Sequence, residues 1–506
     1  MINFVRALSV VNYKVVVIIG KNMATLEEIR KTRLEKLAIL KKKGLEPYPI
    51  SASADRRSLA DVAENFSKYE KKEIVIAGRI MAIRGQGGLI FFTLQDGSGK
   101  FQGLLKKDES GEAPFQLFAA LADIGDFIEA GGTIFVTKRG GKTLLVKSWR
   151  ILSKSLRPLP EKWHGLQDTE ARYRHRYLDL LLNPELKTMF ARKAAFWSAT
   201  REFLQQQGFL EVETPTLEIT TGGAEARPFK THHNDFDLDL YLRISVGELW
   251  QKRLMAAGFE KTFEIGRVYR NEGTSAEHLQ EFTNMEFYWA YAGAKEGMKL
   301  CRELYIAIAK KVYGKTKFEA RGFKFDLADE WPEIDYAEEI KKQIGLDITK
   351  ASDTEIKNKL NELGIAYKGE NRERLLDTLW KHCRKTIAGP AFLVGHPKIV
   401  APLSKSNPQA PEKTEMFQPL IAGSEVGRGY SELNDPLEQR TRFDEQKKLL
   451  AAGDEEAMMP DEEFVEMLEY GMPPACGFGF GERLFAILED KPLRETQLFP
   501  LMRSKI

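Results

Sequence analysis

Residues 263–273 read FEIGRVYRNEG, and residues 281–288 read EFTNMEFY. A polar loop separates these two runs, and we predict two antiparallel strands. Arg270 and Glu272 are two residues apart, which would point both side chains to the same face of a strand. An arginine there can hold a carboxylate or a phosphate through two parallel hydrogen bonds. An Arg-x-Glu pair on its own, however, is more often a structural ion pair.

Two further segments flank this pair of strands. Upstream, a helix expected over residues 187–207 leads into GFLEVETPTLE at 208–218, a helix–strand element ending at Pro215 of a kind that usually builds a dimer interface. Downstream, GFGFGER at 477–483 opens a predicted helix that continues as LFAILE. Glycines at alternate positions leave room for a flat ligand or a close backbone, and Arg483 would project from the first helical turn toward a nucleotide. A glycine-rich run is a weak indication by itself.

The N-terminal third has a different pattern. Glycine-containing turns separate five short strands, which we predict at 73–80, 88–95, 100–106, 133–138 and 143–148. With a helical segment at 114–124, this pattern favours a small OB-type barrel, a fold that commonly binds oligonucleotides. A helix with a surplus of basic residues is expected before it, over 25–43. That surplus fits either a solvated helix face or a contact with a polyanion.

Composition sets limits on the class of protein. The 506 residues, 43% hydrophobic and 29% charged, fit a soluble globular chain of two or three domains. A net charge of +3 argues against coating nucleic acid by charge alone. The three cysteines are far apart and lack CxxC spacing, so we expect neither a zinc site nor a disulfide framework. The apolar stretch 10–20 is too short to cross a bilayer.

The expected domain organisation follows from these patterns. We interpret residues 1–22 as an extension or start-site over-prediction, with Met23 as the start; a signal peptide is the weaker alternative. Residues 23–157 would form the N-terminal helix and barrel, and residues 158–506 a mixed α and β domain. The charged, helix-like stretch 336–385 is expected to be an inserted helical subdomain.

The three segments, in this order, resemble motifs 1, 2 and 3 of class II aminoacyl-tRNA synthetases. Other runs make the resemblance specific to bacterial-type lysyl-tRNA synthetases and extend it over residues 26–503. These runs are LEKL at 34–37, RYRHRYLDL at 172–180, GGAEARPF at 222–229, THHN at 231–234, SELND at 431–435 and LFPLMR at 498–503.

This resemblance implies an α+β chain with an N-terminal OB-fold anticodon-binding domain. The catalytic domain would be built on an antiparallel sheet with flanking helices. The implied enzyme activates lysine with ATP, using Mg²⁺, and transfers it from lysyl-adenylate to the 3′-terminal adenosine of tRNA(Lys). It would be a homodimer in the cytoplasm, with no membrane partner.

The resemblance also implies a lysine site. A site for a substrate with a terminal ammonium should offer carboxylates, because a buried unpaired charge is costly. Glu248 and the backbone of Gly223 would hold the α-amino group, and Arg270 the carboxylate. The side-chain ammonium would contact Glu286, Tyr288 and Glu432, and Arg428 and Tyr430 complete the implied set.

The implied ATP site is adjacent, and Arg270 and Arg483 are the catalytic candidates. Arg270 would also bind the α-phosphate, Glu272 the adenine amine and His278 the phosphates, while Phe282 stacks on the base and Arg483 binds from the other side. The Mg²⁺ ligands would be Glu425 and Gln418, since magnesium prefers oxygen. In the barrel, Phe91 would stack on an anticodon base, and Gln102 and Arg84 would read base edges.

Four features depart from the family pattern. Gln418 stands where an acidic metal ligand is usual, and Arg428 where an asparagine is usual. The run SVGE at 245–248 has one residue more than the family and lacks its proline. In the barrel, Lys142 or Thr143 stands where an acidic base-reader is common. These changes fit either a divergent active branch or altered kinetics.

Three other kinds of protein share parts of this pattern. The acidic pocket argues against an aspartate or asparagine synthetase of the same subclass, and a site for aspartate would need a cation there. A ligase that lysylates a protein would lack the N-terminal barrel. A non-catalytic RNA-binding paralogue would be favoured by loss of Arg270 or Arg483, and both are present.

Overall fold

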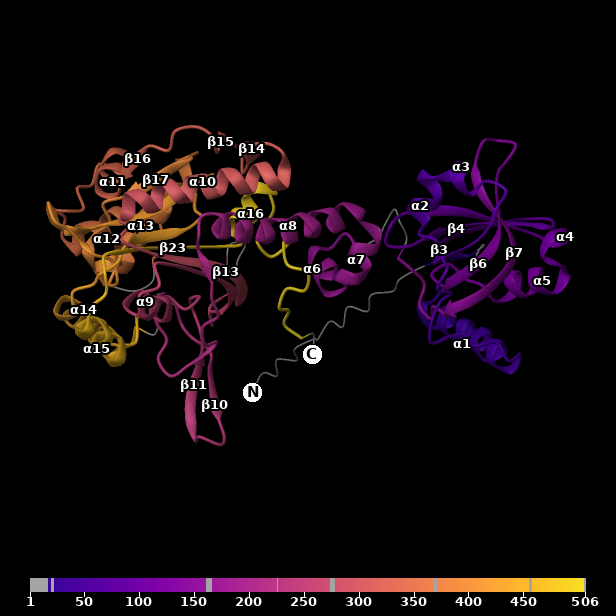
Figure 1. Cartoon of the computed structure of the whole chain (residues 1–506), viewed down its shortest axis with the longest axis horizontal. Coiled ribbons are helices and arrows are strands. Elements are labelled where there is room, and N and C mark those ends of the chain that lie inside the picture. The colour runs from indigo at the N-terminus through magenta and orange to yellow at the C-terminus, as the bar shows by residue number, and fades with distance from the viewer. Residues whose placement is uncertain are drawn as a thin grey trace, which may run out of the picture. The chain divides into compact units, whose positions relative to one another are not determined.

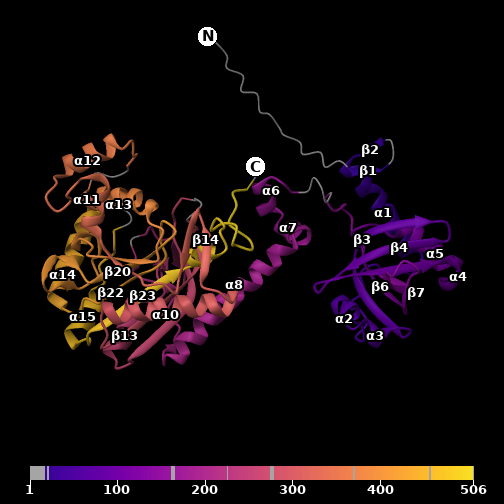
Figure 2. The same cartoon turned by 90° about the horizontal axis from the view of Figure 1, so that it is seen from above.

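The computed structural model describes residues 17–19, 22–160, 166–224, 226–273, 278–367, 371–454 and 457–504. It divides into two compact units, residues 1–182 and 183–506 (Figure 1, Figure 2). Of the predicted extension 1–22, residues 1–16, 20 and 21 lie outside the described residues. The strands β1 (Val17–Ile19) and β2 (Asn22–Ala24) pair antiparallel. The domain boundary near residue 157 stays a prediction.

The first unit opens on α1 (Leu26–Lys42), the helix expected over 25–43. Thr25 caps it, because its hydroxyl accepts from the Glu28 backbone while the Glu28 carboxylate accepts from the Thr25 backbone. Acidic residues in the first turn and lysines in the last turn complement the helix dipole. Leu40 is buried with Leu121 and Ile151, so the helix is fixed against the domain that follows.

Five strands then close into a barrel in the order β3-β4-β5-β7-β6. They are β3 (Glu73–Gln86), β4 (Leu89–Gln95), β5 (Lys100–Lys106), β6 (Phe127–Val136) and β7 (Lys142–Ser153). The short helices are α2 (Leu59–Glu64), α3 (Phe66–Tyr69), α4 (Lys107–Ser110), α5 (Glu112–Leu121), α6 (Thr169–Arg174) and α7 (Arg176–Leu182). Alternation along β4 turns Ile90, Phe92 and Leu94 into the core. The predicted barrel is confirmed, although β3 runs six residues further and β6 starts six earlier than expected.

The second unit is built on a nine-stranded sheet in the order β16-β17-β20-β22-β23-β13-β12-β8, with β21 paired to β20. All neighbours are antiparallel except β16–β17 and β12–β8. The strands are β8 (Leu210–Glu211), β12 (Lys261–Tyr269), β13 (Glu281–Ala290), β16 (Glu333–Asp335), β17 (Ala391–Val394), β20 (Met416–Ile421), β21 (Ser424–Glu425), β22 (Arg428–Ser431) and β23 (Ala475–Gly481). The predicted antiparallel pair is therefore β12 and β13.

Two long helices, α8 (Pro184–Gln206) and α10 (Ala294–Tyr313), lie side by side along one face of this sheet (Figure 1). That face is aromatic, because Phe287, Phe417 and Phe478 are buried next to one another across three strands. Tyr305 of α10 packs edge-on against Phe480 of the same sheet face. The opposite face of the sheet therefore remains for polar side chains.

Shorter elements complete the unit. Its other helices are α9 (Glu248–Ala256), α14 (Pro436–Ala451), α15 (Glu462–Tyr470), α16 (Arg483–Leu488) and η2 (Lys398–Val400). Three small sheets add β9 (Leu217–Glu218), β10 (Lys230–His233) with β11 (Leu238–Leu242), β14 (Lys317–Ala320) with β15 (Phe323–Asp326), and β18 (Ser406–Asn407) with β19 (Ala410–Thr414). The β10–β11 hairpin projects from the body of the unit (Figure 1).

The stretch 336–385 holds α11 (Tyr336–Ile344), α12 (Asp353–Glu362), α13 (Arg372–Cys383) and the start of η1 (Arg384–Thr386). Buried residues of these helices form one cluster with Leu393 and Leu420 of the sheet. The helices thus pack on the sheet edge next to β17 and β20. Within the described part of the chain, no helix has the length and apolarity needed to span a membrane.

Candidate active site

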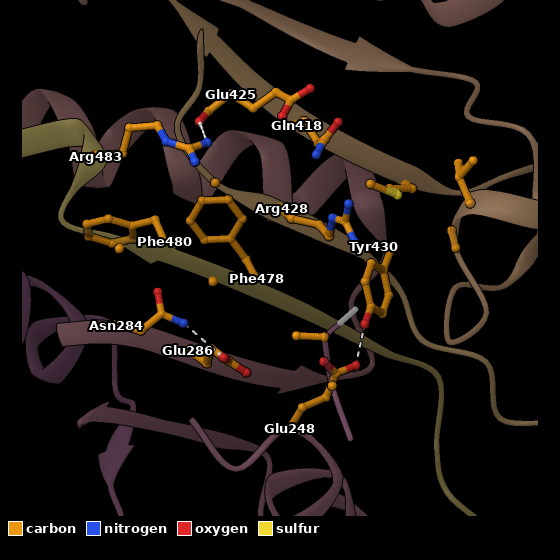
Figure 3. Close-up of a pocket in the computed structure, with 18 of the residues that line it drawn as sticks. Glu248, Asn284, Glu286, Gln418, Glu425, Arg428, Tyr430, Phe478, Phe480 and Arg483 are labelled. Carbon is orange, nitrogen blue, oxygen red and sulfur yellow. Dashed lines mark hydrogen bonds between the residues drawn. The ribbon is translucent and has the colours of Figure 1, made fainter. Parts of the chain in front are cut away.

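A cavity of about 460 Å³ opens on the polar face of the sheet in the second unit. All the residues expected to bind lysine, ATP or metal line it. They are Gly223, Glu248, Arg270, Glu272, His278, Phe282, Glu286, Tyr288, Gln418, Glu425, Arg428, Tyr430, Glu432 and Arg483. Carboxylates Glu248 and Glu286 lie at one end, and Gln418, Glu425 and Arg483 lie at the other (Figure 3).

Sheet register explains how the site is assembled. Glu286 of β13 stands opposite Gly479 of β23, which in turn stands opposite Arg428 of β22. Directly opposed residues project to the same face, so these positions share the cavity side of the sheet. In the same way, Tyr288 and Tyr430 stand on either side of Gly477.

The glycines of GFGFGER are therefore explained by crowding on the cavity face. A Cβ at Gly477 would lie 2.1 Å from Glu432 Oε1, and one at Gly479 would lie 2.7 Å from Glu286 Cγ. Residues 477–481 of this run end the strand β23, and the helix predicted to follow them is α16, which begins at Arg483.

One correction concerns Arg270 and Glu272. The strand β12 ends at Tyr269, so these residues follow it in a loop and the two-residue alternation does not place them. Arg270 is oriented instead by its Nε and Nη2, which both donate to the Ile244 carbonyl at 3.3 Å. Its guanidinium lies 5.3 Å from the centre of the Phe282 ring. Burial lowers the pKa of Arg270, and the charges of Glu272 and Glu286 oppose that shift.

Three buried carboxylates form the acidic end. Glu286 accepts from the Val246 backbone at 2.8 Å, from Asn284 at 3.0 Å and from the Tyr288 hydroxyl at 3.2 Å. The Tyr430 hydroxyl donates to Glu248 (Figure 3). Burial, reinforced by the Glu248 charge, raises the pKa of Glu286 to about 7.

Glu432 is the most deeply buried of the three, at 1% exposure. Burial raises its pKa to about 8, although the nearby Lys252 ammonium acts in the opposite direction. Carboxylates held this far from water favour a ligand that brings positive charge. This end of the cavity can therefore accept ammonium groups.

The position of Glu248 depends on a sharp turn. Gly247 has a left-handed backbone (φ 66°) and caps the N-terminus of α9, which begins at Glu248. A Cβ at Gly247 would lie 2.1 Å from the Thr214 hydroxyl oxygen, so no other residue fits. The tight turn at Gly247 thus directs Glu248 into the cavity.

The other end of the cavity holds Glu425. Burial would raise the pKa of Glu425, but the charges of Arg384, Arg483 and Arg428 outweigh burial and hold that pKa below its usual value. Its Oε1 accepts from the Trp380 indole at 2.6 Å, and its backbone carbonyl accepts from Arg483 at 2.9 Å. One ionised carboxylate is the donor that a divalent cation needs alongside phosphate oxygens.

Gln418 is engaged by a neighbour. Its Oε1 lies 2.9 Å from Nε2 of His396, which must carry the proton because an amide oxygen only accepts. Burial lowers the pKa of His396 to about 4, so this imidazole is neutral at pH 7. An amide oxygen has two lone pairs, so Gln418 can accept from His396 and also offer this oxygen to a metal ion.

The barrel carries the three expected base-reading residues on its outer face. Arg84 stands opposite Phe91 in the β3–β4 ladder, and Thr93 stands opposite Gln102 in the β4–β5 ladder. Phe91 is half-buried and alternates with the inward-facing core residues of β4. Gln102 donates to the Thr143 hydroxyl at 2.9 Å. These side chains form a surface with an aromatic face next to hydrogen-bonding groups.

Sequence reasoning missed several residues of the site. Lys252 pairs with Glu248 four residues before it on α9, a spacing that could have indicated the contact. Asn284 precedes Glu286 by two residues on the same strand, which was also readable. His396 and Trp380 left no local signal, because each reaches the cavity from an element distant in sequence.

Comparisons with known proteins agree with this architecture. Residues 168–503 match the family described as class II tRNA synthetases (D, K and N), and residues 74–152 match the OB-fold nucleic acid binding domain. The lysine–tRNA ligase of Pelotomaculum thermopropionicum is 44% identical over 95% of this chain and 96% of its own length. That of Thermotoga maritima is 41% identical over 95% and 97%, and that of Moorella thermoacetica 43% over 94% and 98%.

Proposed function

This chain belongs to the lysine–tRNA ligases among the class II tRNA synthetases, and we propose that its cavity makes lysyl-adenylate from lysine and ATP. The enzyme is an aminoacyl-tRNA ligase that acts in translation. The observation that carries the cavity assignment is the cluster of Glu248, Glu286 and Glu432, buried on one side of a cavity that has arginines on the other.

Lysine would lie with its two ammonium groups at the acidic end. Glu248 and the Gly223 backbone hold the α-amino group, and a Cβ at Gly223 would come within 2.7 Å of Glu248 Oε2. Glu286, Tyr288 and Glu432 hold the side-chain ammonium, with Tyr430 fixing Glu248. Carboxylates at this position disfavour an aspartate side chain, because the like charges repel. They disfavour an asparagine side chain because its amide oxygen would have no hydrogen-bond donor.

The lysine carboxylate faces the arginines. Arg270 holds it together with the α-phosphate of ATP, and Arg428 supplies a second cation on the same sheet face. A carboxylate oxygen attacks the α-phosphorus, and the bond to the oxygen bridging to the β-phosphate breaks, releasing pyrophosphate. Negative charge is redistributed over the phosphate oxygens, which fixed guanidinium groups stabilise without any protein nucleophile.

The nucleotide lies along the part of the cavity that lysine does not use. Phe282 offers its ring to the adenine and Glu272 its carboxylate to the exocyclic amine, while His278 and Arg483 meet the phosphates. Arg483 is steadied by its hydrogen bond to the Glu425 carbonyl. In the second step the 3′-hydroxyl of the terminal adenosine of tRNA(Lys) attacks the carbonyl carbon, and AMP leaves.

A divalent metal is used by the family, and we assign Mg²⁺ to Glu425, with Gln418 as a candidate second ligand. The ionised, inward-facing carboxylate of Glu425 fits this ion, and magnesium commonly needs only one or two carboxylates plus substrate phosphates. When bound, the ion neutralises phosphate charge. Gln418 would add a neutral oxygen, which also accepts from His396.

The partners are tRNA(Lys), read by Phe91, Gln102 and Arg84 on the barrel, and a second copy of the chain. A homodimer is supported by exposed apolar side chains of the helix–strand element and its continuation, namely Leu210, Leu217 and Ile219. A cytoplasmic location is supported by the three buried cysteines, which form no disulfide.

The test is ATP–pyrophosphate exchange by the purified protein with each of the twenty amino acids in turn. Exchange with lysine alone, followed by charging of tRNA(Lys), is the expected outcome. Exchange with aspartate or asparagine would overturn the assignment of the acidic end. No exchange with any amino acid would indicate a non-catalytic RNA-binding paralogue.

A further inference from the structure

A lysine of the chain itself is buried beside the lysine site. Lys252 of α9 is 1% exposed, and its Nζ lies 2.8 Å from Glu248 Oε1 and 2.5 Å from Glu432 Oε2. The same Nζ is 5.4 Å from the centre of the Tyr430 ring and 6.0 Å from that of Tyr288. Phe464 adds a third ring at 5.8 Å, so this buried ammonium is confined by two carboxylates and three aromatic rings.

The ammonium of Lys252 uses one oxygen of each carboxylate and leaves the other toward the cavity. Glu248 Oε2 is the oxygen that lies next to Gly223, and Glu432 Oε1 is the one that lies next to Gly477 on the cavity face. Both glutamates line the cavity, whereas Lys252 is not one of its described lining residues. Lys252 therefore bridges the two carboxylates on the side away from the cavity and does not occupy the space for the substrate.

The charges of these side chains match those of free lysine. Glu248, Glu286 and Glu432 carry three negative charges if all are ionised, and Lys252 compensates one of them. Two charges remain, which equals the two ammonium groups of free lysine. An amino acid with a neutral side chain would leave one buried carboxylate uncompensated, and such a charge is costly.

We infer that Lys252 is a positioning residue. Its ammonium bridges Glu248, in the subsite for the α-amino group, and Glu432, in the subsite for the side-chain ammonium. It also leaves the site with two uncompensated negative charges, the number that a substrate with two ammonium groups neutralises. This inference rests on the proposed function. It adds a specificity determinant that never touches substrate and acts only through Glu248 and Glu432.

The pH dependence of lysine binding should reveal this role of Lys252. If the ammonium of Lys252 is removed, the remaining carboxylates repel one another more and hold a proton to higher pH. Other titratable or charged groups surround Glu248, Glu286 and Glu432. They are Tyr288 of β13, Tyr430 and Arg428 of β22, Cys476 of β23, Glu218 of β9 and Arg270 of the loop after β12.

The experiment compares Lys252→Met with the wild type in ATP–pyrophosphate exchange from pH 6 to pH 9. We expect KM for lysine to rise about tenfold or more while KM for ATP stays near its wild-type value. We also expect the rise of kcat/KM for lysine with pH to move up by about one unit or more, so that it is still incomplete at pH 9, because an opposite charge beside a carboxylate is lost.

Side-chain selectivity supplies a second readout. A protonated carboxyl can donate to a hydroxyl group, so the preference for lysine over 6-hydroxynorleucine should fall about tenfold in Lys252→Met. Arg253→Met is the matched control, since Arg253 is the next residue of α9 and pairs with Asp461 away from the cavity. It should leave the lysine pH profile and this preference unchanged.

Two results would overturn the positioning role of Lys252. One is an unchanged pH midpoint in Lys252→Met. The other is a lower KM for lysine in that variant, which would mean that Lys252 competes with the substrate. If Lys252→Met fails to fold, judged by thermal unfolding, Lys252→Gln keeps a donor without the charge and should show the same upward shift. Wild-type protein without lysine-dependent exchange would instead overturn the proposed function, and this inference with it.

Discussion

Individual side chains in this cavity are controlled mainly by burial. Glu286 and Glu432 lie away from water and hold their protons to about pH 7 and 8, whereas Glu425, which is surrounded by arginines, stays ionised to lower pH. In the proposed mechanism, glutamate thus binds ammonium groups at one end of the cavity and a metal ion at the other. Two predictions depend on the charge of one or two of these groups.

The first concerns the pH dependence of lysine binding. Both carboxyl groups have raised pKa values, so lowering the pH below 8 protonates Glu432 and then Glu286, and each neutral carboxyl loses attraction for an ammonium. The ammonium groups of lysine stay charged in this range. KM for lysine should therefore rise roughly tenfold between pH 8 and pH 6.5, with little change in KM for ATP. A flat lysine KM would contradict the assignment of the acidic end.

The second concerns Arg270. Replacing it by alanine removes a fixed positive charge beside the reacting carboxylate and phosphate, so the exchange rate should fall at least about 10²-fold to 10³-fold. Arg267→Ala is a suitable control, because Arg267 lies on the preceding strand and forms an exposed ion pair with Glu281. Such surface pairs contribute little. Normal exchange by Arg270→Ala would remove this residue from the mechanism.

At the scale of elements, β23 is central to the site. Its glycines face the cavity and its phenylalanines face α10, so one strand provides both the packing of the sheet and the space for substrate. Neighbouring β13 and β22 supply the side chains that fill the space left by those glycines. The order of strands in the sheet therefore determines which functional groups meet.

Gly479→Ala tests this packing. The added methyl group would lie 2.7 Å from Cγ of Glu286, so the carboxylate must move while the strand is retained. We expect KM for lysine to increase about tenfold through loss of one aligned charge-assisted contact. The change in melting temperature should stay small. Gly85→Ala on β3, where an added Cβ meets nothing within 4 Å, is the control and should change neither quantity.

At the scale of the whole molecule, the chain separates chemistry from RNA recognition. The cavity lies entirely within residues 183–506, and the barrel forms its own core within residues 1–182. Activation of lysine and selection of tRNA can therefore be altered independently.

Phe91→Ala should show this independence. Stacking on one base contributes roughly 1–3 kcal/mol, so kcat/KM for tRNA charging should fall about 5-fold to 150-fold. Lysine-dependent pyrophosphate exchange should stay at the wild-type rate, because Phe91 is a half-buried outer residue of the barrel and does not line the cavity. A parallel loss of exchange would mean that the substitution unfolds the chain or that the units do not act separately.

Much of this architecture was readable in the sequence. Turn residues and the alternation of apolar side chains predicted the barrel strands, and the motif runs predicted which side chains would meet in one cavity. The sequence also identified the acidic pocket expected for an ammonium. These features follow from spacing along the chain, which acts over a few residues, and from ordered motifs that a family keeps.

Only the tertiary structure decided the rest. It placed Arg270 in a loop and made residues 477–481 a strand. It also brought the Gln418 oxygen to His396 and joined Lys252 to Glu432, 180 residues away in sequence. Contacts of this kind depend on strand register and on which charges are buried together, because desolvation makes each buried carboxylate require a partner from whichever element lies nearest. Local spacing carries no record of those distant neighbours.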